Sequence, residues 1–131
     1  MHIRTVLFIC EHGSAKNVVA VAHFNRLVVA RGLDLRAISR GTTPDVSMHP
    51  AAVAGLAADG LGASGDPVLL SDTDLSDAIQ VVTFSALPVS YRLPKGTQVW
   101  TVPAVSEDYA GARTAIVSRL ELLLEDLVRH S

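Results

Sequence analysis

The 131-residue chain has a single cysteine, little charge and no long apolar run. One thiol excludes an intramolecular disulfide and a zinc site with several cysteine ligands. Lysine and arginine number 11 against 13 acidic residues, so no basic excess favours a polyanion, and a nucleic-acid partner is not expected. No apolar run reaches the roughly 18 residues of a membrane span, and the N-terminal run lacks a signal-peptide cleavage site. These absences predict a cytoplasmic protein without a membrane partner.

What the chain does have is apolar mass in short runs. Hydrophobic residues are 49% of the sequence, enough for the core of one domain of ordinary size. Periodicity and cap residues predict strands at 3–9, 35–39, 78–84 and 97–102, and helices at 17–31, 50–59, 71–78 and along the stripe from Ile116 to Leu127. Strands that alternate with helices pair in parallel. The sequence therefore predicts one three-layer α/β domain over residues 1–131, with a four-stranded parallel sheet and helices on both faces.

The segment between the first strand and the first helix carries the candidate site. It reads Cys10-Glu11-His12-Gly13-Ser14-Ala15-Lys16-Asn17. Its backbone N–H groups and the positive helix N-terminus predict an anion-binding loop, to which Lys16 adds a full charge and Gly13 a left-handed turn. A thiol in that field is expected to have a lowered pKa and to attack phosphate or arsenate. The alternative is that Cys10 only packs at the end of a core strand, as buried cysteines often do.

This loop and several later segments resemble the low-molecular-weight protein tyrosine phosphatase family, which includes a branch of arsenate reductases. The family has Cys-x5-Arg-Ser directly after its first strand, and Val6–Cys10 matches the approach to that motif. The later similar segments are Ser39–Pro44, His49–Val53, Asp59–Leu61 and Asp77–Phe84. The resemblance covers most of the chain in order and implies a low-molecular-weight phosphatase-like fold.

The resemblance also implies roles for the loop residues. Cys10 would be the nucleophile, and Lys16 stands where the family has its phosphate-binding arginine. A lysine is a point charge and lacks the planar, two-pronged contact of a guanidinium, so the exchange changes the site. Gly13 replaces the family's loop-bracing asparagine and Asn17 its serine, while for His12 substrate contact and a solvated position both stay open. The implied substrate-binding residues are Glu11, His12, Gly13, Ser14, Ala15 and Asn17.

The family's general acid is the aspartate of an Asp-Pro pair before the last helix. In this chain that place reads Val102-Pro103, so the acid is missing from its expected position. Glu107 and Asp108 follow within a few residues and are the candidate catalytic acids. The alternative is that these two side chains only complement the dipole at the start of the last helix.

The resemblance implies a hydrolase of phosphate monoesters that works through Cys10. Its activity is expected to be weak or specialised, because a missing acid costs about 10²–10⁴-fold in rate. Three alternatives stay open: a single-cysteine arsenate reductase that uses an external thiol, a non-catalytic module that binds an oxyanion or phosphoprotein, and a phosphocarrier. The expected ligand is phosphate or a similar oxyanion, free or carried by a phosphorylated protein or small phosphomonoester. Neither a cofactor nor a metal ion is expected, since the histidines lack metal-ligand spacing.

Overall fold

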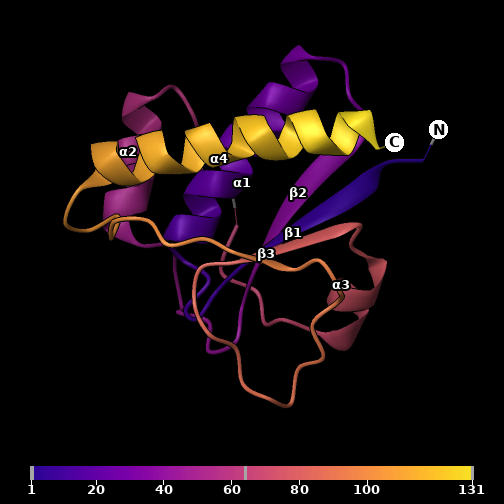
Figure 1. Ribbon diagram of the computed structural model, residues 1–131. Helices are drawn as coiled ribbons and strands as arrows, with labels where there is room; N and C mark the ends of the chain where they lie inside the picture. The colour runs from indigo at the N-terminus through magenta and orange to yellow at the C-terminus, as the bar shows by residue number, and fades with distance from the viewer. Residues whose placement is uncertain (1, 64, 131) are drawn as a thin grey trace.

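The computed structural model describes residues 2–63 and 65–130, in which strands and helices alternate along the chain (Figure 1). In order, the elements are β1 (Arg4–Cys10), α1 (Lys16–Ala30), β2 (Leu35–Gly41), α2 (Pro50–Ala58), α3 (Asp72–Asp77), β3 (Gln80–Thr83), β4 (Gln98–Val99) and α4 (Tyr109–Arg129). Each predicted strand and helix is present, most of them with bounds close to those expected. None of the helices in this part of the chain combines the length and apolarity needed to cross a membrane.

The four strands form one parallel sheet in the order β2-β1-β3-β4. β1 lies in the middle, where Leu7 pairs with Ile38 of β2 on one side and Val81 of β3 on the other. The predicted four-stranded parallel sheet is confirmed. Because the neighbours of β1 lie on opposite sides, its carboxyl end is a topological switch point, the place where open α/β sheets bind ligands. Cys10 is the last residue of β1.

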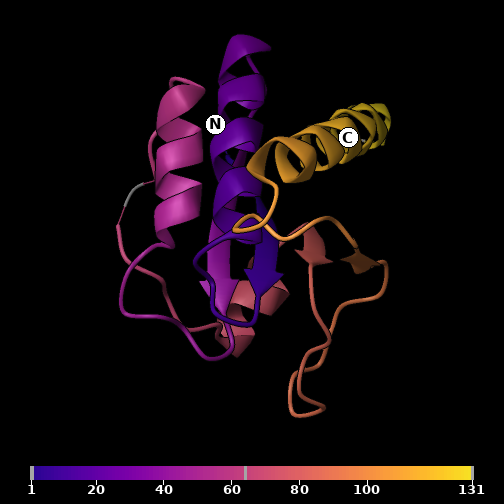
Figure 2. The same ribbon diagram turned by 90° about the vertical axis from the view of Figure 1, so that its left-hand side faces the viewer.

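Both faces of the sheet are covered, as the uninterrupted apolar run of β1 predicts. Val6 and Phe8 are fully buried on the face covered by α1, α2 and α4, which lie together on one side (Figure 1, Figure 2). Leu7 and Ile9 are fully buried on the other face, against Leu75 of α3. The prediction of helices on both faces is confirmed. The ring of Phe8 is central to the larger core, where it contacts the rings of Phe24, Phe84 and Trp100.

β4 is shorter than predicted. It ends at Val99, whereas the sequence pattern predicted a strand over residues 97–102. The Trp100 N–H still donates to the Thr83 carbonyl at 2.9 Å, but the Trp100 side chain is buried in the core. Pro103 has no N–H with which to continue the ladder. The apolar residues after β4 are therefore buried by the core and not by strand pairing.

One partly buried carboxylate, that of Asp59 at the end of α2, joins three helices. It accepts hydrogen bonds from the Tyr109 hydroxyl at 2.7 Å and from Arg113 Nη1 at 2.9 Å, both on α4. His23 of α1 lies with its Nε2 3.4 Å from the same carboxylate. Burial opposes the charge of Asp59, but the two hydrogen bonds hold the pKa of its carboxyl below the usual range. This group therefore links α1, α2 and α4 into one layer.

Gly55 of α2 lies against the ring of Tyr109, where an added Cβ would overlap the ring carbons. We expect Gly55→Ala to lower the free energy of unfolding by about 1–3 kcal/mol, because overpacking outweighs the higher helix propensity of alanine. Gly62→Ala is the matched control, since nothing lies within 4 Å of a Cβ at that position. Urea unfolding measures both variants. Equal stabilities would contradict the packing of α2 on Tyr109.

Candidate functional site

The candidate site is a cavity of about 260 Å³ at the carboxyl end of β1. Its floor is the continuous segment 10–16, and its walls are Asp45 and His49 from the β2–α2 loop, Phe84 and Ser85 after β3, and residues 104–106 after β4. Parallel strands bring their carboxyl ends to the same edge of a sheet, which is why four segments distant in sequence meet at this place.

The β1–α1 loop is held against the end of β2 by two glycines. Gly13 has a φ of +65°, a left-handed conformation that glycine adopts without strain. A Cβ on Gly41 would lie 2.8 Å from the backbone nitrogen of Gly13, and a Cβ on Gly13 would lie 3.0 Å from that of Gly41. The two backbones therefore approach closely only because neither residue has a side chain. The predicted left-handed turn at Gly13 is confirmed.

Three carbonyl groups of the β1–α1 loop point toward the β2–α2 loop. Each accepts a backbone N–H: Thr43 donates to Glu11 at 2.8 Å, Asp45 to His12 at 3.0 Å and His49 to Ser14 at 2.9 Å. In a trans peptide the N–H points opposite to the C=O. The N–H groups that share these three peptide units, those of His12, Gly13 and Ala15, therefore turn to the inner side of the loop, where the Cys10 thiol lies.

The thiol of Cys10 lies at the N-terminus of α1. It accepts hydrogen bonds from the backbone N–H groups of Asn17 and Lys16, and Ala15, the N-cap residue, has no side-chain bond to this helix end. Burial raises the pKa of the Cys10 thiol from 9.0 to about 11, against the opposing effects of these N–H groups and of the Lys16 charge. The predicted lowering of this pKa is therefore wrong. The loop acts in the expected direction, but the loss of water around the sulfur outweighs it.

Most of the loop residues singled out in the sequence line the cavity. Lys16 is half-buried, and of the described lining residues it alone carries a permanent positive charge. Ser14 is buried, and its Oγ donates to Asp45 Oδ2 at 2.7 Å. The exposed side chains of Glu11 and His12 stand at the rim. That these residues bind substrate stays a prediction.

Asn17 is an exception, because it does not line the cavity. Its side chain is fully buried: Nδ2 donates to the Arg40 carbonyl at 3.1 Å, and Oδ1 accepts the Val18 N–H at 3.0 Å. Asn17 therefore braces the loop against β2, and only its backbone N–H reaches the Cys10 thiol. The expectation that its side chain binds substrate is not supported, because that side chain is used inside the protein.

Glu107 and Asp108 also lie outside the cavity wall. The segment that does reach the wall is 104–106, where Ser106 is the polar side chain. Asp108 is the N-cap of α4, and its Oδ1 accepts the Gly111 N–H at 2.9 Å. Glu107 is exposed. The structure brings neither candidate acid to the thiol, and for Asp108 it favours the alternative of a role at the helix start.

Sequence reasoning missed Asp45 and His49, which line the cavity. Asp45 is held by the Ser14 hydroxyl, and its Oδ1 lies 3.6 Å from His12 Nδ1. His49 is the N-cap of α2, where its Nδ1 accepts the Ala51 N–H at 3.0 Å. A usable signal was present, because both residues follow β2, and the ends of neighbouring parallel strands meet at one edge.

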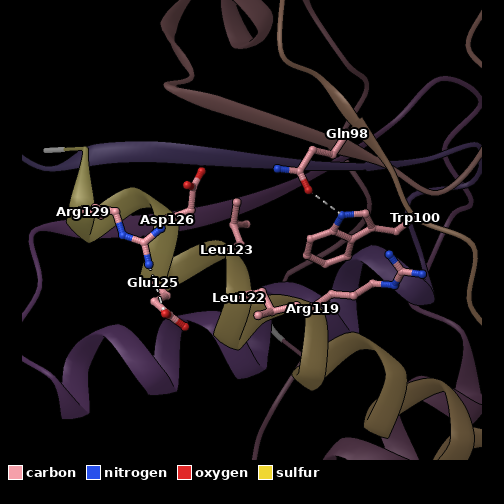
Figure 3. A pocket seen from close by; sticks show the side chains of 8 residues that line it. All are labelled: Gln98, Trp100, Arg119, Leu122, Leu123, Glu125, Asp126 and Arg129. Atoms are coloured by element: carbon pink, nitrogen blue, oxygen red, sulfur yellow. Dashed lines mark hydrogen bonds and ion pairs between the residues drawn. The ribbon is translucent and has the colours of Figure 1, made fainter.

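A larger hollow of about 470 Å³ lies between β4 and α4 (Figure 3). Gln98 and Trp100 form one side and Leu122 the other, and Arg129 is paired with Glu125. The only thiol of the chain lies in the smaller cavity, which is therefore the candidate site. Within residues 2–63 and 65–130, no group of three or more histidine, cysteine, aspartate or glutamate side chains is arranged to hold a metal ion.

No protein-family model and no curated protein matches the chain. Solved structures do match it. The YfkJ protein of Bacillus subtilis matches with a TM-score of 0.86 at 18% identity, over 100% of this chain and 98% of its own. A low-molecular-weight protein tyrosine phosphatase of T. tengcongensis matches with a TM-score of 0.71 at 21% identity, over 98% of this chain and 99% of its own.

This chain has the fold of the low-molecular-weight phosphatases. A thioredoxin-dependent arsenate reductase of Corynebacterium glutamicum shares it, with a TM-score of 0.82 at 21% identity. That match covers 99% of this chain, which spans 64% of the length of the reductase. The fold is therefore common to phosphatases and arsenate reductases, and the choice between these activities depends on the residues of the site.

The pKa of about 11 predicts that Cys10 is alkylated slowly at neutral pH. We expect the rate with iodoacetamide, a neutral reagent, to rise about tenfold per pH unit from pH 7 to pH 10, because only the thiolate reacts. Lys16→Ala should slow the reaction throughout this range, since its charge lowers the pKa of the thiol. Lys95→Ala, at an exposed position, is the matched control. A rate that levels off below pH 9 would contradict the burial of the thiol.

Proposed function

We propose that the protein binds a phosphate-type oxyanion above Cys10 and slowly hydrolyses phosphate monoesters through that cysteine. The observation that carries the proposal is the direction of the peptide groups in the β1–α1 loop. Their carbonyls bond to the β2–α2 loop, and within the described chain no acceptor takes the N–H groups of His12, Gly13 and Ala15. These donors, Lys16 and the N-terminus of α1 suit the oxygens of a phosphoryl group. The group would be carried by a small phosphomonoester or a protein side chain.

In the proposed reaction the Cys10 thiolate attacks phosphorus. An S–P bond forms as the bond to the leaving oxygen breaks, and water then hydrolyses the phosphocysteine. The loop N–H groups and Lys16 stabilise charge on the phosphoryl oxygens. With a thiol pKa of about 11, about one molecule in 10⁴ carries the thiolate at pH 7. Turnover is therefore expected to be slow and to increase with pH.

Arsenate reduction is the second candidate, because arsenate has the shape and charge of phosphate and proteins of this fold include arsenate reductases. Cys10 is the only cysteine of the chain, so no disulfide can form between two of its own thiols. The two electrons that convert arsenate to arsenite would have to come from thiols oxidised to a disulfide, at least one of them external. This candidate predicts arsenate-dependent oxidation of an added thiol.

The hydrolase proposal predicts slow turnover of p-nitrophenyl phosphate. We expect the wild-type protein to release p-nitrophenol at a constant rate without a burst, because the scarcity of the thiolate makes formation of the phosphocysteine the slow step. Cys10→Ser should lose at least 10³-fold in rate, because the alcohol is a far weaker nucleophile. Binding of phosphate without any turnover would instead indicate a binding module.

Lys16 is expected to contribute much of the affinity for the oxyanion. A hydrogen bond to a charged group contributes roughly 1.5–3 kcal/mol, so Lys16→Ala should weaken phosphate binding roughly 10- to 150-fold. Lys95→Ala should bind as the wild type does. Isothermal titration calorimetry with inorganic phosphate measures both. Unchanged affinity in Lys16→Ala would mean that this side chain does not face the anion.

A further inference from the structure

We propose that His12 is the proton donor to the leaving group in this site, with its imidazolium ring held between Glu11 and Asp45. This inference rests on the proposed hydrolysis at Cys10. It supplies the group that protonates the departing oxygen. The segment after β4 does not supply this group, because Glu107 and Asp108 lie outside the cavity wall.

The walls of the cavity limit the choice of donor. The wall after β4 consists of residues 104–106, which carry no acidic side chain. Among the described residues that line the cavity, the groups able to exchange a proton are Cys10, Glu11, His12, Lys16, Asp45 and His49. Cys10 is the nucleophile and Lys16 the charge that faces the anion. Ordinary carboxyl groups have lost their proton at neutral pH, whereas imidazole exchanges one near neutrality. Two histidines remain.

His49 is already used as a helix cap. Its Nδ1 accepts the backbone N–H of Ala51 at 3.0 Å at the start of α2, so the neutral ring carries its proton on Nε2. A second proton would have to go to Nδ1, where it would break the cap. Nδ1 of His49 is thus occupied in holding the start of α2.

The ring of His12 lies next to hydrogen-bond acceptors, whereas that of His49 accepts a hydrogen bond. Its Nδ1 lies 3.2 Å from the Thr43 carbonyl, which only accepts hydrogen bonds, so Nδ1 carries a proton. A second proton goes to Nε2, which lies 3.9 Å from Glu11 Oε2. On the other side, Asp45 Oδ1 lies 3.6 Å from Nδ1. The ring therefore lies between two carboxylates, while Lys16, the other charged group of the loop, attracts the substrate.

Asp45 positions this ring. Its backbone N–H donates to the His12 carbonyl at 3.0 Å, and its Oδ2 accepts the Ser14 hydroxyl at 2.7 Å. The carboxylate is thus fixed by two bonds to the β1–α1 loop, and Oδ1 is the oxygen that lies toward His12. Asp45 acts through His12 and is a positioning residue.

The place of His12 in the cavity matches the path of the leaving group. In an in-line displacement the leaving oxygen lies on the far side of phosphorus from the attacking sulfur. Cys10 is at the floor, so this oxygen points to the mouth of the cavity. The His12 side chain is 57% exposed and stands at that rim. Nε2 is the ring nitrogen that gives its proton there.

The protons balance over the two steps. In the first, the S–P bond forms, the P–O bond breaks and the leaving oxygen takes the proton from His12 Nε2, which becomes neutral. In the second, Nε2 takes a proton from water as the water oxygen attacks phosphorus, and the S–P bond breaks to return the thiolate. His12 is again an imidazolium, phosphate departs, and no other reactant is needed.

The dependence of rate on the leaving group tests the proposal. Single-turnover rates of the wild type and His12→Gln are compared on p-nitrophenyl phosphate and on phenyl phosphate between pH 5 and pH 9, with His130→Gln as the matched control. We expect His12→Gln to lose about 10²–10⁴-fold on phenyl phosphate and less than about tenfold on p-nitrophenyl phosphate, whose leaving group needs little protonation. Between pH 5 and pH 9 the wild-type rate should rise and then level off where His12 loses its proton, whereas the rate of the variant should keep rising as the Cys10 thiolate forms. Asp45→Asn should also lose more rate on phenyl phosphate than on p-nitrophenyl phosphate, by a smaller factor than His12→Gln.

Equal losses on both substrates, with a rate that levels off in the variant as it does in the wild type, would overturn the role of His12. Sulfate binding tells this failure apart from failure of the hydrolase proposal, because the charge of sulfate is constant between pH 5 and pH 9. If His12 faces the anion, the wild type binds sulfate more tightly at pH 5.5 than at pH 8.5, and His12→Gln shows a smaller difference. If the wild type hydrolyses the esters and both proteins show the same pH dependence of sulfate affinity, the role of His12 is overturned and the hydrolase proposal stands. A profile that depends on His12, in a wild type that hydrolyses neither ester, would overturn the hydrolase proposal and the donor step with it.

Discussion

The close approach of the backbones at Gly13 and Gly41 is the contact on which the rest of the site depends. A Cβ on either residue would lie 3.0 Å or less from the backbone nitrogen of the other. This contact brings the β1–α1 loop within hydrogen-bonding reach of residues 43–49, which bond to its carbonyl groups. Because each peptide is planar, engaging the carbonyls on one side turns N–H groups to the other. The anion-binding character of the loop therefore follows from a backbone contact with β2.

The close packing that shapes the loop also disfavours the charged form of the Cys10 thiol. Two backbone N–H groups and the charge of Lys16 favour the thiolate of Cys10, yet burial raises its pKa to about 11. Desolvation therefore exceeds the combined electrostatic gain. A guanidinium could add planar, two-pronged contacts to an anion that a lysine cannot make. The fold provides the position of the nucleophile, while the local side chains determine how reactive it is.

Much of the fold could be predicted from the sequence because its signals are local. The apolar run of β1, the proline in the first turn of α2 and the stripe of α4 follow the periods and caps of regular structure. β4 was the exception. Val102 is buried like a strand residue, but its burial comes from packing in the larger core and not from strand pairing. Apolar composition alone does not distinguish these two kinds of burial.

The sequence by itself determined the order of the elements, the place of Cys10 at the end of β1 and the loop that surrounds it. Only the tertiary structure decided which other groups reach the thiol. It brings Asp45 and His49 to the cavity and leaves Glu107 and Asp108 outside. In the sequence, Glu107 and Asp108 lie within a few residues of the place where the resembling family has its acid. The tertiary structure also decided the direction in which the pKa of Cys10 is shifted. Both outcomes depend on how segments distant in the chain pack at one edge of the sheet, and that packing sets the distances and the exclusion of water on which electrostatics depend.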